Sequence, residues 1–196
     1  MGNDSLWISH LPKSTHIDPT QIEGNVSLEQ KQAQANIFSF FIDGAGSSPS
    51  GYGVTLGKRV KYVSMNINEV DGRGLQAEGI CEVAVTKDMV NVFNVLHGAC
   101  AAYLIDLCSS APLVSLGIYQ GNDTSGVSQS MNIIYHSSPK LGAELRIISN
   151  SISNQGKIRA ARCEIRDKKT DALLVSAVHT KVGGGEKAAK LPVAKL

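Results

Sequence analysis

The chain has 196 residues, with 19 Lys or Arg, 17 Asp or Glu and a formal net charge of +2. This length fits one domain with extensions and can bury a sizeable core, whereas the nearly balanced charge excludes the strongly basic surface typical of nucleic-acid-binding proteins. The four cysteines show no C-x-x-C spacing, so we interpret them as reduced structural thiols and expect no metal site.

Residues 1–52 are predicted to form an N-terminal extension with one short helix. Residues 1–26 are mixed and polar, without periodicity. Ser27-Leu28-Glu29-Gln30 has the form of a capping box, which favours a helix over 28–42, and Asp43-Gly44 is typical of its end. The N-terminus lacks the apolar core of a signal peptide, so we expect the protein not to be secreted.

Six later segments have the alternating apolar pattern and the flanking turn residues of β-strands. They are Lys61 to Ile67, Leu75 to Val85, Val127 to Tyr135, Glu144 to Ile152, Ile158 to Arg166 and Leu173 to Val182. The first two are joined by Asp71-Gly72-Arg73-Gly74 and read as a hairpin. Between the second and third strands lies one long apolar segment.

This segment, residues 97–117, is apolar on every side of a helical wheel, which predicts a wholly buried helix. Its only charged residue is Asp106, and a lone buried carboxylate is unfavourable unless something uses or satisfies it. A membrane span is disfavoured, because Asp106 near its centre would cost roughly 2.5 to 3.5 kcal/mol. Pro112 would clash with the carbonyl of Cys108, so we expect a kink or an end to the helix near residues 109–111.

Two strands, one helix and four strands indicate an α+β fold in which a six-stranded antiparallel sheet wraps around one long central helix. We assign this domain to residues 53–182 and a flexible tail to residues 183–196. Some apolar residues are expected on the outer face of the sheet, away from the helix: Ala84, Ile134, Ile148 and Ala161. Covering that face would require a homo-oligomer.

Several separated motifs resemble the hotdog-fold acyl-coenzyme A thioesterases, and more narrowly the thioesterase superfamily member 2 type, which is related to bacterial phenylacetate-pathway thioesterases. The resemblance covers roughly residues 55 to 182. It rests on Asn91, Leu96-His97-Gly98, Asp106, Gly126-Val127-Ser128, Met131-Asn132-Ile133, Tyr135 and His179-Thr180-Lys181.

The resemblance implies hydrolysis of a fatty or aromatic acyl-coenzyme A, without a metal or a bound cofactor. Asn91 and the backbone amide of Gly98 would hold the thioester carbonyl at a helix N-terminus, where free N–H groups suit a developing oxyanion. Asp106 would activate water or act as the nucleophile, and Ser128 would help to place it. The site would be assembled between two copies, in a homodimer or a homotetramer.

Coenzyme A carries phosphates, so the mouth of the site should be basic. Matching the ligand-contacting segments of the family gives these substrate-binding candidates: His97, Tyr135, His136, Ser137, Ser138, Lys140, Gln155, Gly156, Lys157 and Lys181. Among them, Lys140 and Lys157 are our choices for phosphate contacts, because a flexible ammonium suits an exposed pyrophosphate.

Other interpretations remain open. His97 could shape the helix entry, Asn91 could cap a turn, and Asp106 could be only a buried hydrogen-bond acceptor. A non-catalytic acyl-coenzyme A binder is an alternative, because Ala99 replaces a glycine that is common in relatives. An enoyl-thioester hydratase is less favoured, because Val92 stands where such enzymes carry Asp.

The chain finishes in Ala194-Lys195-Leu196, a close variant of the Ser-Lys-Leu address read by the peroxisomal import receptor. We therefore expect a peroxisomal or a cytoplasmic protein.

Overall fold

The computed structural model describes residues 10–46, 51–72, 74–154 and 156–183. Its helices and strands are α1 (Leu28–Asp43), α2 (Val54–Gly57), β1 (Lys61–Val70), β2 (Gly74–Ala84), α3 (Gly98–Gln120), β3 (Val127–Tyr135), β4 (Glu144–Ser153), β5 (Ile158–Asp167) and β6 (Leu173–Val182). Short 3-10 helices occupy Pro19–Gln21, Gly44–Gly46 and Lys87–Met89. Gln155, the tail beyond residue 183 and the tripeptide Ala194-Lys195-Leu196 lie outside the described residues, so the calls made on them stay predictions.

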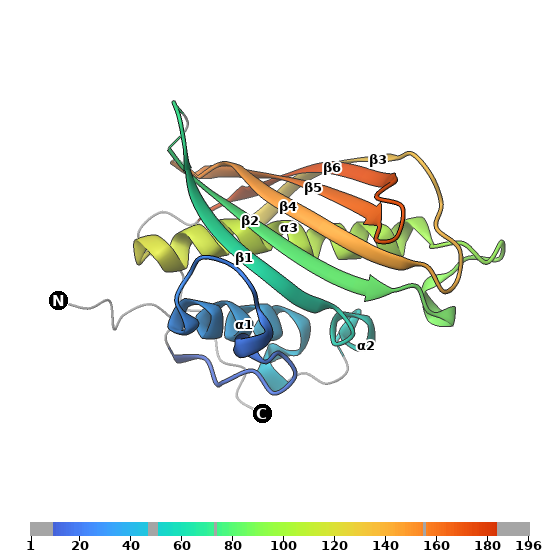
Figure 1. Ribbon diagram of the computed structural model, residues 1–196, viewed down its shortest axis with the longest axis horizontal. Helices are drawn as coiled ribbons and strands as arrows, with labels where there is room; N and C mark the ends of the chain where they lie inside the picture. Colours follow the sequence, from blue (N-terminus) through green and yellow to red (C-terminus); the bar gives the residue numbers. More distant parts are fainter. Residues whose placement is uncertain (1–9, 47–50, 73, 155, 184–196) are drawn as a thin grey trace.

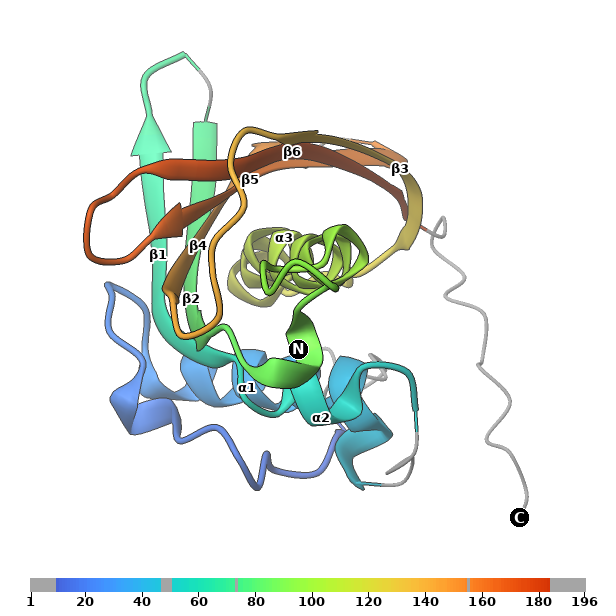
Figure 2. The ribbon, with the colours of Figure 1, turned by 90° about the vertical axis from the view of Figure 1, so that its right-hand side faces the viewer.

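The six strands form one antiparallel sheet in the order β1-β2-β4-β5-β6-β3. Figure 1 shows the sheet lying across α3, and Figure 2, which looks nearly along α3, shows the sheet curling around the helix. Alternate strand residues point to the concave face, as the period of two requires. The predicted α+β architecture is confirmed.

Helix α3 fills the concave side of the sheet and is buried over most of its length. It is long and apolar enough to cross a membrane, but most of that apolar window is covered by the rest of the fold. The expected end of the helix near residues 109–111 is wrong, because α3 continues to Gln120 and Pro112 lies inside it; the alternative expectation, a kink, stays a prediction. Packing against the sheet and α1 holds the helix together; an isolated helix with an internal proline would lack this support.

Helix α1 covers the side of α3 that the sheet leaves open (Figure 2). Its predicted capping box is present, since the Ser27 hydroxyl accepts from the Gln30 N–H at 3.2 Å and the Gln30 side chain accepts from the Ser27 N–H at 3.0 Å. The apolar side chains of Ile37 and Phe38 are buried. The described part of the extension, residues 10–46, is therefore packed against the domain.

The two edges of the sheet differ. At β1, the backbone of Glu23 pairs with Val63 and Met65 and covers part of the edge. At β3, nearly every residue is exposed, including 76% of Val127 and 54% of Ile134. An edge strand that presents apolar side chains and free backbone groups favours pairing with another chain.

One residue assigned to the outer face of the sheet is misplaced. Ala161 is fully buried and shares the concave face of β5 with Cys163 and Ile165. The small side chain of Ala161 did not indicate which face of the sheet it would occupy. In the structure, the pleat of the strand places residues 161, 163 and 165 on the same face.

Candidate active site

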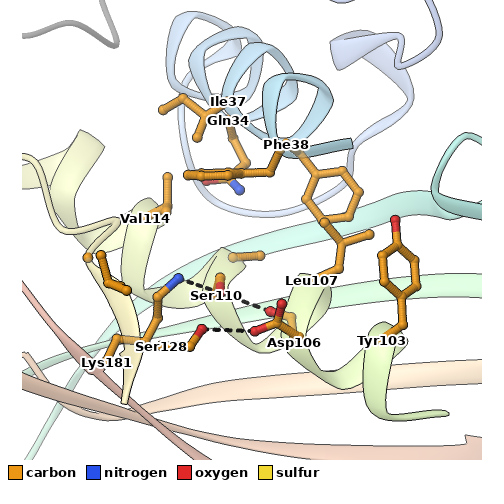
Figure 3. Close-up of a pocket in the computed structure, with 14 residues that line it drawn as sticks. Gln34, Ile37, Phe38, Tyr103, Asp106, Leu107, Ser110, Val114, Ser128 and Lys181 are labelled. Atoms are coloured by element: carbon orange, nitrogen blue, oxygen red, sulfur yellow. Dashed lines mark hydrogen bonds between the residues drawn. The ribbon is translucent and has the colours of Figure 1, made fainter. Parts of the chain in front are cut away.

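Asp106 is the charged residue of α3, and its carboxylate faces a cavity between α1, α3 and the start of β3 (Figure 3). The Asp106 side chain keeps 48% of its surface exposed, although the helix around it is buried. The Ser128 hydroxyl donates to Asp106 Oδ1 at 3.0 Å. Ser128 lies where the register of β3 against β6 shifts, and such bulges re-aim side chains. The structure therefore brings these two predicted catalytic residues together.

The cavity has a volume of about 290 Å³. Its walls are mainly apolar: Ile37, Phe38 and Phe41 come from α1, and Leu107, Ala111 and Val114 come from α3. Figure 3 shows Phe38 and Ile37 reaching toward α3 from the opposite side of the space. This shape suits an apolar group placed next to the carboxylate.

Lys181 and His179 enter the same region from β6. The Lys181 ammonium donates to the Ser110 hydroxyl at 2.8 Å and lies 5.9 Å from the centre of the Phe41 ring. Lys181 is only 5% exposed, and its burial lowers the pKa of the ammonium, although Asp106 opposes that shift. Lys181 was predicted to bind substrate at a basic mouth of the site, but its place on the concave face of β6 directs its side chain inward, to the wall of the cavity beside Asp106.

The other two predicted catalytic residues, Asn91 and Gly98, and the predicted substrate-binding residue His97 lie just before or at the start of α3. His97 is the N-cap, and its Nδ1 accepts from the Ala99 N–H at 3.0 Å, which agrees with the structural interpretation. Gly98 is the first helical residue, so its N–H has no partner inside the helix. The Asn91 Oδ1 accepts from the Phe93 N–H at 2.9 Å. Because the turn uses Oδ1, the Nδ2 group of the Asn91 side chain remains as a hydrogen-bond donor that could reach a substrate.

The two halves of the predicted site are the Asp106–Ser128 pair and the group at the start of α3. They do not meet within one chain. Asp106 follows Gly98 by eight residues on the same helix, which separates them by ~12 Å along its axis. A carbonyl bound at Gly98 would lie beyond the reach of a water on Asp106 of the same copy. The structure thus groups Asp106 with Ser128, and Asn91 with His97 and Gly98.

Comparison with known proteins identifies the family. No protein-family model matches the chain. Mouse acyl-coenzyme A thioesterase 13 is 36% identical over 103 residues, which is 52% of this chain and 70% of the mouse protein; the human protein of that name is 34% identical over the same length. The chain belongs to the acyl-coenzyme A thioesterase 13 family. The structure of zebrafish thioesterase superfamily member 2 covers 76% of this chain and 96% of its own, with a TM-score of 0.59 and 22% identity, and supports the hotdog fold.

In this thioesterase, the surface segments predicted to bind coenzyme A are exposed but separate. Tyr135 lies opposite Val175 on β6, and its hydroxyl donates to the Gly98 carbonyl at 3.1 Å. Lys157 precedes Ile158, which lies opposite Val182. Seven residues of strand separate these points, or about 23 Å. The other exposed candidates divide in the same way, with His136, Ser137, Ser138 and Lys140 near Tyr135 and Gly156 near Lys157.

The cysteines of this thioesterase are poor candidates for a nucleophile. All four are free, and Cys81, Cys108 and Cys163 are buried. Burial raises the pKa of the partly exposed Cys100 thiol to about 11, so it stays protonated at neutral pH. Among the described residues, no three His, Cys, Asp or Glu side chains are grouped so as to hold a metal ion.

Sequence reasoning missed two parts of the site. It did not assign the apolar face of α1 to the cavity, and it used His179 only as part of a motif. His179 is fully buried, and its pKa is lowered by burial and by Lys181, although Asp106 opposes the shift. The alternation of β6, with apolar Val175 and Ala177 at the preceding inward positions, places His179 and Lys181 on the concave face and could have found them.

Proposed function

We propose that this thioesterase hydrolyses a fatty or aromatic acyl-coenzyme A to the free acid and coenzyme A, with Asp106 as the working group. One observation carries the proposal: the only carboxylate of an otherwise uncharged helix opens into an apolar cavity and accepts a hydrogen bond from Ser128. An acyl chain fits the apolar wall while its carbonyl lies beside the carboxylate. The reaction needs no cofactor beyond the coenzyme A of the substrate.

In the reaction, a water molecule held by Asp106 attacks the thioester carbonyl and gives up a proton to the carboxylate. The oxygen of the tetrahedral intermediate is stabilised by the Gly98 N–H and the Asn91 amide. Collapse of the intermediate breaks the carbon–sulfur bond and releases the coenzyme A thiolate, which takes up the proton that Asp106 received from water. In the other route, Asp106 attacks the carbonyl itself and displaces the coenzyme A thiolate; water then hydrolyses the resulting anhydride to the free acid and the Asp106 carboxylate, and a proton released from water passes to the thiolate.

We further propose that two copies build each site, because the halves lie ~12 Å apart along α3 in one copy. A second copy paired at β3 would bring its own Asn91 and Gly98 toward the Asp106 of the first. The exposed apolar residues of β3, Val127 and Ile134 among them, support pairing at this edge. Such a homodimer, alone or as half of a homotetramer, also allows Lys140 of one copy and Lys157 of the other to share one coenzyme A.

The test is the release of free thiol from a panel of fatty and aromatic acyl-coenzyme A esters. Asp106→Asn should lower kcat by at least about 100-fold, whereas Asp171→Asn, an exposed control in the turn before β6, should not change it. Unchanged turnover in Asp106→Asn would refute the assigned chemistry. Tight binding of intact esters by the wild-type protein, measured by calorimetry and without hydrolysis over hours, would instead identify a non-catalytic binder.

A further inference from the structure

The imidazole of His179 is fully buried beside Asp106 and has no role in the reaction described so far. Its Nδ1 lies 2.7 Å from the Ser109 hydroxyl. Its Nε2 is also buried, has no hydrogen-bond partner among the described residues and lies 3.7 Å from Asp106 Oδ1. An unpartnered ring nitrogen in the core requires an explanation, because buried polar atoms are usually satisfied.

Ser109 differs from the neighbouring buried serines of α3. The hydroxyls of Ser110 and Ser115 donate to backbone carbonyls one turn earlier in the helix, at 2.9 and 3.0 Å. The Ser109 hydroxyl instead meets the His179 ring. It is therefore able to donate to Nδ1 and to decide which ring nitrogen carries the proton.

The surroundings of His179 favour a neutral imidazole and one of its two tautomers. Burial and the nearby Lys181 lower the pKa of His179, so the imidazole is neutral at neutral pH. If Nδ1 carried the proton, the Nε2 lone pair would face the negative Asp106 oxygen. If Ser109 donates to Nδ1, Nε2 carries the proton and points an N–H at that oxygen, which is the more stable arrangement.

We propose that His179 is a positioning residue for Asp106: its Nε2–H, held in place by Ser109, fixes Oδ1 of the carboxylate. Ser128 donates to the same oxygen at 3.0 Å. With Oδ1 held from two sides, Oδ2 is the atom that faces the reacting water. The distance of 3.7 Å shortens on substrate binding, since catalytic hydrogen bonds are often long in the free enzyme and the half-exposed carboxylate can turn. This inference rests on the proposed function of Asp106.

Two isosteric substitutions test the proposal. The amide nitrogen of Gln can occupy the place of Nε2, whereas that of Asn occupies the place of Nδ1. His179→Gln should keep kcat within about threefold, and His179→Asn should lose about 10- to 100-fold, as expected when a reacting group is misplaced by about 1 Å. KM should change by less than about twofold in both. Equal kcat values in the two folded variants would overturn the proposal.

A second measurement does not depend on activity. The ring ¹⁵N shifts of His179 should show a protonated Nε2 and an unprotonated Nδ1 in the wild-type protein. Ser109→Ala should mix the two forms and lower kcat, whereas Ser115→Ala, a buried control on the same helix, should change neither. A proton on Nδ1 in the wild type would overturn the proposal even if both His179 variants fail to fold. If the wild type hydrolyses no thioester, the proposed function fails while this readout still tests the arrangement.

Discussion

Replacing Val114 by phenylalanine should shorten the acyl chains that the enzyme accepts. Val114 lines the cavity and is 5% exposed, and Figure 3 shows it facing the space below α1. It follows Asp106 by eight residues on α3, so it lies ~12 Å further along the helix. The larger ring would occupy the end of the cavity remote from the carboxylate.

The size of the effect follows from the apolar contact that is lost. Each methylene excluded from the cavity loses ~0.8 kcal/mol of binding, which is about a fourfold decrease in kcat/KM. If the ring displaces three methylenes, the longest substrates lose ~2.4 kcal/mol, or roughly 60-fold. Chains too short to reach Val114 should be hydrolysed as before.

The assay is kcat/KM for straight-chain acyl-coenzyme A esters from acetyl to palmitoyl. Val114→Ala should shift the preference toward longer chains, and Val83→Ile, a conservative change at a buried residue of β2 that is not part of the cavity wall, should leave the profile unchanged. The added ring is expected to destabilise the fold by ~1–3 kcal/mol, so melting is measured in parallel. Parallel profiles for Val114→Phe and the wild type would refute the assignment of this cavity to the acyl chain.

Four further outcomes are expected. Ser128→Ala should lower kcat roughly tenfold, because a hydrogen bond to a charged group contributes about 1.5–3 kcal/mol and this one is partly exposed; an unchanged kcat would contradict its role. In a single turnover in heavy-oxygen water, label found in the Asp106 carboxylate by mass spectrometry would identify the nucleophilic route, since the oxygen enters that carboxylate only when water attacks the Asp106 carbonyl of the anhydride. The pKa of His179 is lowered in the fold, so the unfolded chain binds more protons and stability should fall as pH drops below about 6.5; the fall in melting temperature should be smaller in His179→Gln. Gly24 has a φ of +114° and no room for a side chain against the Met65 carbonyl, so Gly24→Ala should lower the free energy of unfolding by about 1–3 kcal/mol in denaturant titration, and equal stability would show that the extension is not anchored there.

The sequence was sufficient to predict the elements that pack on one another. The alternating strands and the wholly apolar helix each predict which residues are buried. For example, β3 has the predicted bounds. The capping residues Ser27 and Gln30 were readable because their hydrogen bonds are local. Asp106 was readable for the opposite reason, since a lone charge breaks the pattern around it.

The features that depend on distant packing were not readable. Pro112 does not end α3, because the sheet and α1 support the helix on both sides. The alternation of β6 gives the inward direction of Lys181, but its hydrogen-bond partner, Ser110 of α3, lies 71 residues away in the sequence. The spread of the coenzyme A candidates over about 23 Å follows from strand register, which no single segment specifies.

Stability and chemistry make opposite demands on the residues around Asp106. The Asp106 carboxylate has to be ionised to accept a proton, yet the residues next to it on α3 are mostly buried. Lys181, Ser110 and His179 surround Asp106 and are themselves buried polar groups, where apolar residues of similar size would pack more stably. Lys181→Met should therefore raise the melting temperature, by about 2–4 °C for a gain of 1 kcal/mol. If it lowered the melting temperature instead, Lys181 would be stabilising the fold, and its burial would need no functional reason.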